Sequence, residues 1–198
     1  FPHAPIINNE SINKNYLPTV AINSRTKLLS GLLGNALDVN LGLTGTGQDV
    51  SIMRSTLIQT GILLNADTAP VIDLNPADDN IRNMLHVIQN FFSGAGVNGE
   101  QNFTTLYNNL TLPQYGIGLK SGVIPIYIAT VLHLNRSNLV IKNGNYEVKI
   151  TPDLLNSINE CPNNYSVILE DWNDEKAAYM SRLERIFEPF IREQEKAY

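Results

Sequence analysis

Apolar side chains recur every three or four residues along most of the chain, and this spacing predicts a largely helical protein. The first such pattern starts at Thr19 and stops at Gly34-Asn35, a pair typical of a helix C-terminus. Two further helices are expected over residues 48–63 and 103–110. The apolar faces that the first two helices should bury comprise Val20, Leu28, Leu29, Leu32, Leu33, Ile52, Met53, Leu57, Ile58, Ile62 and Leu63.

Another helix is predicted to begin at Asn75-Pro76, because Asn caps helix N-termini and Pro fits the first helical position. Asp78 and Asp79 follow and suit the positive end of the helix dipole. Residues 94–99 are rich in glycine and should end this helix. Its buried face should comprise Ile81, Leu85, Ile88, Phe91 and Phe92.

The stretch from residue 115 to residue 172 holds the longest apolar helical pattern and the clearest hairpin signal. Its helix is expected to begin near Ser121, with Pro125 in the first turn, where proline is tolerated. The buried positions of this helix should be Ile124, Tyr127, Ile128, Val131 and Leu132.

Strand-like residues flank Asn143-Gly144, and an Asn-Gly pair adopts a tight hairpin turn at little cost. The two strands of this hairpin are expected over residues 139–142 and 146–150. A short helix from Thr151 and a third strand over residues 165–169 should follow, and a shorter strand is expected near residues 71–73.

The order of these elements predicts an α+β fold that is predominantly helical and has three parts. Residues 1–75 are expected to form a helical N-terminal module, and residues 76–172 a winged-helix-like unit of helix, β-hairpin, short helix and strand. Residues 173–198 are charged and predict a long C-terminal helix. A narrow apolar seam of this helix suits packing on its own domain or on a partner, and it comprises Ala177, Met180, Leu183, Phe187 and Phe190.

Composition limits the classes of function. The net charge of −5 and the pI of about 5.1 predict no bulk attraction to nucleic acid or anionic lipid. The single cysteine, Cys161, allows neither an internal disulfide nor a zinc site built on cysteines. No apolar run reaches the roughly 20 residues of a membrane span and no signal peptide is recognised, so a cytoplasmic location is expected. The start at Phe1 rather than Met leads us to expect a piece of a longer polypeptide.

The segment from Gly42 to Asp49 has the glycine spacing of a phosphate-binding loop, GxxxxGK[ST]. Gln48 stands where such a loop carries lysine, and Asp49 stands where it carries a hydroxyl. A carboxylate at that position would repel phosphate. We therefore expect a structural turn that leads into a helix.

Reactive side chains do not gather in a pattern that predicts catalysis. Residues 94–99 match GxGxxG, but a helix precedes them, whereas a dinucleotide-binding loop follows a strand. His3, His86 and His133 have no metal-ligand spacing, and the clustered carboxylates lie near expected helix starts. We predict a non-enzymatic chain with no catalytic, cofactor-binding or metal-binding residue.

A helix followed by a hairpin is also the arrangement of DNA-binding winged helices, so nucleic-acid contact is the alternative function. The candidate contacts are Lys120, Arg136, Lys142 and Lys149. Basic residues supply most of the non-specific affinity for phosphate, and here Glu147, Asp153 and Glu160 offset them.

Three scattered motifs carry a family resemblance. They are FP with PIINNESIN within residues 1–13, LGL (41–43) with TGIL (60–63), and YGI (115–117) with GVIP (122–125). With these motifs the chain resembles an accessory region of large bacterial P-loop ATP-binding proteins of the genome-defence type, which act in restriction and phage exclusion.

The resemblance implies that a parent protein carries an ATPase elsewhere and that this chain lies outside its Walker motifs. It transfers no catalytic residue and no cofactor to this chain. The function it implies is scaffolding or coupling, in which the chain packs on an ATPase core, on the remainder of the parent chain or on a partner protein.

Overall fold

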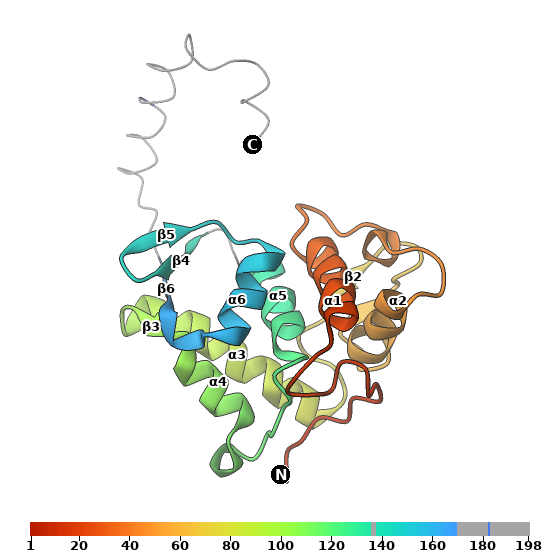
Figure 1. The fold of residues 1–198 in the computed structure, drawn as a ribbon, viewed down its shortest axis with the longest axis horizontal. Coiled ribbons are helices and arrows are strands. Elements are labelled where there is room, and N and C mark those ends of the chain that lie inside the picture. Colours follow the sequence, from red (N-terminus) through yellow and green to blue (C-terminus); the bar gives the residue numbers. More distant parts are fainter. Residues whose placement is uncertain (136–137, 170–181, 183–198) are drawn as a thin grey trace.

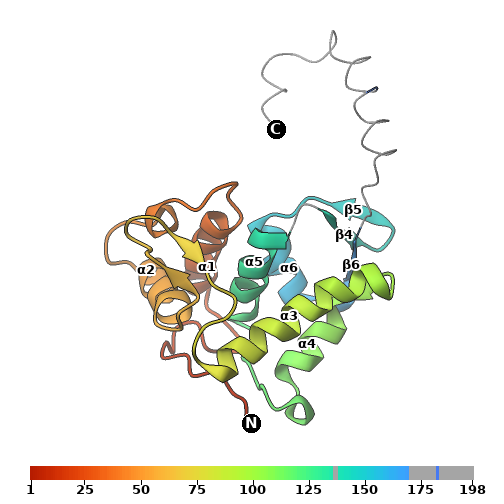
Figure 2. The same cartoon turned by 180° about the vertical axis from the view of Figure 1, so that it is seen from behind.

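The computed structural model describes residues 1–135, 138–169 and 182. The described chain is a mixed α+β fold with two small antiparallel sheets, which confirms the predicted class (Figures 1 and 2). Several predicted features lie outside the described residues: Arg136, the long C-terminal helix, and the seam residues Met180, Leu183, Phe187 and Phe190.

The chain opens with an irregular segment, residues 1–17, which we call the N-terminal strap. Helix α1 (Thr19–Leu32) follows and packs against α2 (Gln48–Met53). The expectation that Val20 is buried is wrong, since this side chain is 67% exposed. The buried face of α1 instead comprises Ala21, Ser24, Arg25, Leu28, Leu29 and Leu32, and Val20 lies on its flank.

Two irregular turns shape the region between α1 and the first sheet. A 3₁₀ turn, η1 (Val39–Gly42), contains two non-glycine residues with left-handed backbone, Asn40 and Leu41, and a π-helical turn, η2 (Arg54–Ile58), continues α2. The first sheet pairs β1 (Leu63–Leu64) with β2 (Val71–Ile72), so the short strand expected near residue 71 is confirmed.

Helix α3 (Asp79–Val97) starts later than the predicted Asn75-Pro76. Asp78 is the N-cap, because its Oδ1 accepts hydrogen bonds from the backbone N–H of Asn80 and Ile81 at 2.8 and 3.0 Å. Asn75 instead lies in the preceding loop, where its Oδ1 is 3.2 Å from Nε2 of His86. The prediction of an Asn75 cap is therefore wrong.

The glycines at 94–99 do not all lie in a loop, because α3 continues to Val97. A Cβ at Gly96 would lie 2.6 Å from Cδ2 of Leu169, on the last strand of the second sheet. Gly96 thus permits close approach of a helix to a strand, and the helix ends at Val97, within the glycine-rich stretch that was expected to end it.

The second sheet contains β3 (Gln101–Asn102), β4 (Leu139–Asn143), β5 (Tyr146–Val148) and β6 (Tyr165–Leu169) in the order β3-β6-β4-β5. All its neighbours are antiparallel. The predicted hairpin is confirmed, with Gly144 at φ +58° in its turn, although β5 ends at Val148 instead of residue 150.

Three further helices complete the fold: α4 (Phe103–Thr111), α5 (Ile124–Asn135) and α6 (Pro152–Glu160). Helix α5 lies at the centre, and every residue from Ile124 to Leu132 is buried. It packs against α1, α3 and α6, as the two opposite views show (Figures 1 and 2). Pro125 occupies its first turn as predicted.

One contiguous hydrophobic core runs through the described chain, from Ile7 in the strap to Val167 in β6. It crosses residue 75, where the boundary between the two predicted modules lies. That boundary stays a prediction. None of the helices within the described ranges combines the length and apolar character that a membrane span requires.

Candidate functional site

Asn9 fixes the N-terminal strap on α2. Its Nδ2 donates to Oγ of Ser55 at 3.0 Å and to Oγ of Ser51 at 3.4 Å. Its Oδ1 accepts from the backbone N–H and the hydroxyl of Ser11, at 3.0 and 2.6 Å. Both ends of the amide are therefore occupied, and the strap is held in a defined position beside the helix.

The far side of the strap contacts the loop that precedes α5. The N–H of Gly122 donates to the carbonyl of Lys14 at 2.9 Å, and Oγ of Ser121 donates to the carbonyl of Asn15 at 2.8 Å. A Cβ at Gly122 would lie only 2.3 Å from the carbonyl oxygen of Ile12, so glycine is required for this approach. The strap thus joins the α2–η2 segment to the α5 loop, and the first and third of the motifs that carry the family resemblance meet at Ile12 and Gly122.

Arg25 is a buried cation where α1, α6 and the α5 loop meet. Its Nε donates to Oδ1 of Asn156 at 3.0 Å and its Nη1 donates to the carbonyl of Gly122 at 2.9 Å. Burial lowers the pKa of the Arg25 guanidinium, and the nearby Tyr107 phenol acts in the opposite direction. Because the guanidinium is enclosed by these partners, its role is to join three elements rather than to bind a ligand.

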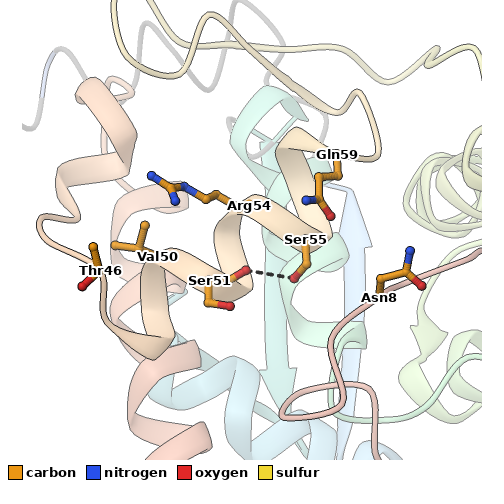
Figure 3. Close-up of a pocket in the computed structure, with 7 residues that line it drawn as sticks. All are labelled: Asn8, Thr46, Val50, Ser51, Arg54, Ser55 and Gln59. Carbon is orange, nitrogen blue, oxygen red and sulfur yellow. Dashed lines mark hydrogen bonds between the residues drawn. The ribbon is translucent and has the colours of Figure 1, made fainter.

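A polar pocket of about 210 Å³ opens on the outer side of α2 and η2. Figure 3 shows that Arg54 extends over Val50 toward Thr46, whereas Asn8 lies beyond Ser55 on the other side. The described side chains that line the pocket are Asn8, Thr46, Val50, Ser51, Arg54, Ser55 and Gln59.

The π-helical turn η2 shapes this pocket. The N–H of Gln59 donates to the carbonyl of Arg54 at 2.8 Å, a bond that spans five residues where an α-helix spans four. The extra residue changes the direction in which side chains leave the helix, and Arg54 and Gln59 both line the pocket. Such single π turns inside helices are frequent at functional sites.

The chemistry of the pocket suits binding and does not suit nucleophilic attack. The hydroxyl of Ser55 is directed at the carbonyls of Ser51 and Ile52, at 3.0 and 3.1 Å, and accepts from Asn9 (Figure 3 shows the bond to Ser51). Among the described lining residues no histidine or carboxylate is present to act as a base. Arg54 instead offers a positive charge with several N–H donors.

The glycine-rich loop behaves as the sequence predicts. Gly42 and Gly45 have φ of +73° and +79°, and Gly47 is the N-cap of α2. Gln48 accepts a hydrogen bond from Ser24 Oγ at 3.0 Å, and Asp49 lies 3.4 Å from Nζ of Lys27. The two residues that depart from the phosphate-loop pattern therefore connect α2 to α1.

The structure places the candidate nucleic-acid contacts on separate elements. Lys120 is exposed in the α5 loop, and Lys149 is exposed just after β5. Lys142 on β4 lies 3.7 Å from Oε2 of Glu100, and Glu147 is its cross-strand neighbour. Carboxylates thus surround Lys142 and reduce the positive potential of the hairpin.

The histidines and Cys161 stand apart from this pocket. Nδ1 of His133 lies 2.8 Å from the carbonyl of Leu32, and Cys161 is an exposed free thiol. Within the described ranges, no three of the His, Cys, Asp and Glu side chains are grouped so that they could hold a metal ion. The pocket residues Asn8, Arg54 and Gln59 were not identified from the sequence. The motif around Asn8 was the one signal that pointed to them.

Comparison with protein-family models, with curated proteins and with solved structures finds no match to this chain.

Proposed function

We propose that this chain is a non-catalytic accessory module of a large bacterial ATP-binding protein of the genome-defence type. Its role is to couple an ATPase core to the rest of the parent chain or to a partner subunit. The family resemblance of the three motifs suggests this role. Its physical support is the close approach of the first motif to the third along the strap, where Ile12 lies against Gly122 although the two are far apart in the sequence.

The burial of α5 is the observation that carries the proposal. In the winged-helix-like unit that we propose for residues 76–172, α5 precedes the β4–β5 hairpin, which would be the wing. DNA-binding proteins of the helix-turn-helix class place their recognition helix in the major groove. Here the corresponding helix would be α5, which α1, α3 and α6 cover, so a role in protein packing is favoured over base recognition.

The β4–β5 hairpin, the wing of the proposed unit, is an exposed surface available for contact with the rest of the parent protein. Tyr146 at the hairpin is 80% exposed, and β5 is an edge strand of the four-stranded sheet. Edge strands have unpaired backbone groups that pair readily with another chain. The hairpin is therefore the part of this module that we expect to contact the ATPase core.

Cross-linking of the complete parent protein tests this role. An amine-reactive cross-linker should join Lys142 and Lys149 of the hairpin to residues of the ATPase region, and Tyr146→Asp should reduce the yield of these cross-links at least several-fold. If Lys142 and Lys149 form cross-links only to residues within 1–198, the proposal is contradicted.

Nucleic-acid contact is the second candidate, favoured by the exposure of Lys120 and Lys149. Each phosphate contact makes the slope of log K against log salt more negative by about 0.9, so contacts from these two lysines would give a slope of about −1.8. Fluorescence anisotropy with a labelled DNA duplex at low salt measures this slope. We expect no saturable binding. Saturable binding whose salt dependence becomes shallower when Lys120 and Lys149 are replaced by alanine would establish nucleic-acid contact.

A further inference from the structure

The polar pocket at η2 presents one positive charge, and no described residue that lines it is acidic. Arg54 is exposed, and within the described chain its side chain makes no ion pair or hydrogen bond. Arg25 and Arg82, in contrast, each donate to partners in the fold. In a chain of net charge −5, the Arg54 guanidinium is thus available to an external anion.

We propose that this pocket binds a single carboxylate group. A guanidinium presents two parallel N–H donors that match the two oxygens of a carboxylate. Thr46 and Ser51 add hydroxyl groups, and the amides of Asn8 and Gln59 supply further donors along the pocket. One arginine balances one negative charge, whereas a phosphate dianion would keep a charge unpaired.

The size of the pocket limits the kind of molecule to which the bound carboxylate belongs. Its volume of about 210 Å³ lies below the roughly 300–1,000 Å³ of pockets for drug-sized ligands. It suits a small free carboxylate or one acidic side chain of a peptide. Both sources present the same chemistry to Arg54, and the experiment below distinguishes them.

The walls of the pocket are held before any ligand arrives. Asn9 bonds both Ser51 and Ser55, and its neighbour Asn8 is thereby fixed against the same helix. The five-residue bond from Gln59 to Arg54 fixes the turn from which both side chains leave. Binding therefore orders the exposed side chains of Arg54, Gln59 and Asn8 on a backbone that is already held in place, which lowers the entropic cost. This inference does not depend on the proposed coupling role.

Two-dimensional NMR of the full chain tests it, with acetate, inorganic phosphate and the peptide acetyl-Gly-Glu-Gly-amide as probes. Acetate should produce saturable shifts at the Nε–H of Arg54 and at the backbone amides of Thr46, Ser51 and Gln59. Arg54→Gln should weaken binding at least tenfold. Arg54→Lys, which keeps the charge but loses the two parallel N–H donors of the guanidinium, should give an intermediate Kd.

Lys120→Ala is the matched control, because it removes an exposed cation elsewhere and should leave the Kd unchanged. Peptide binding that is tenfold tighter than acetate binding assigns the carboxylate to an acidic side chain, and equal affinity assigns it to a free carboxylate. Absence of saturation, an unchanged Kd in Arg54→Gln, or tighter binding of phosphate than of acetate would each overturn the proposal.

Discussion

Two buried tyrosines of the core differ in one hydrogen bond. The hydroxyl of Tyr107 donates to Oδ1 of Asn159 at 3.1 Å, whereas the hydroxyl of Tyr127 on α5 has no partner among the described residues. A buried polar group without a partner costs free energy that the folded state does not recover. The two residues therefore form a matched pair for measuring this cost.

Tyr127→Phe should leave the free energy of unfolding unchanged or raise it by about 1 kcal/mol, because it removes the unpaired hydroxyl and keeps the ring. Tyr107→Phe should lower it by about 1 kcal/mol, because Asn159 loses its donor. Urea denaturation at pH 7 measures both values. A destabilised Tyr127→Phe variant would indicate that the hydroxyl has a partner in solution.

The same tyrosines predict the alkaline limit of stability. Burial raises the pKa of both phenols above the value near 10 that they have in an unfolded chain. The contribution of the two protonated phenols to the free energy of unfolding is fully present below about pH 10. Above it the unfolded state releases protons that the folded state keeps, so the free energy of unfolding falls by about 1.4 kcal/mol per pH unit for each tyrosine.

Urea denaturation between about pH 10 and 12 checks this slope. In Tyr127→Phe the decline should be shallower by about 1.4 kcal/mol per pH unit, since one of the two phenols is gone. A slope equal to that of the unchanged protein would mean that Tyr127 ionises as readily in the folded state as in the unfolded one.

At the scale of elements, the sequence predicts best where a few adjacent residues decide the outcome. Asn143-Gly144 specifies the hairpin, and Thr151 caps α6 as expected through its bond to the N–H of Leu154. Asn75 fails as a cap because Asp78, three residues later, competes for the same helix start. The close approach of Gly96 in α3 to Leu169, 73 positions away, is something that no local pattern reveals.

Arg25 joins α1, α6 and the α5 loop, and we expect Arg25→Ala to lower the free energy of unfolding by about 2–5 kcal/mol. The variant leaves the buried Gly122 carbonyl and the half-buried Oδ1 of Asn156 without their donor, and each loss costs about 1–3 kcal/mol. Lys27→Ala on the same helix is the control. It removes an exposed ion pair to Asp49 and should cost less than about 1 kcal/mol.

Gly122 allows the strap to approach the α5 loop, so Gly122→Ala should lower the free energy of unfolding by about 1–3 kcal/mol. The added methyl would meet the carbonyl oxygens of Ile12 and Lys14 at 2.3 and 2.6 Å, and backbone cannot move aside cheaply. Gly94→Ala adds the same methyl inside α3 at 3.6 Å from its nearest neighbour and should stabilise by about 0.5–1 kcal/mol. Equal effects of the two variants would contradict the position of the strap.

At the scale of the molecule, the sequence correctly predicts the α+β class but not how residues 1–17 pack. Hydrophobic periodicity identifies helices and strands, whereas the strap has no period and is positioned by hydrogen bonds to residues far along the chain. The polar pocket was missed for the same reason, because the strap supplies Asn8 and η2 supplies Arg54.

Because a single core crosses residue 75, we expect one cooperative unfolding transition. Thermal denaturation followed by far-UV and by near-UV circular dichroism should give coincident curves. Two separate transitions would instead support independent modules over residues 1–75 and 76–172.

The bonds between Ser121 and Asn15 also have a consequence for biosynthesis. These residues are 106 positions apart, so after the strap leaves the ribosome it must wait for a loop that is made much later. At about 5–20 residues per second, that delay lasts roughly 5–20 seconds. Throughout it Ile7 and Ile12, both buried in the finished protein, lack the part of the core that α5 supplies and are accessible to chaperones.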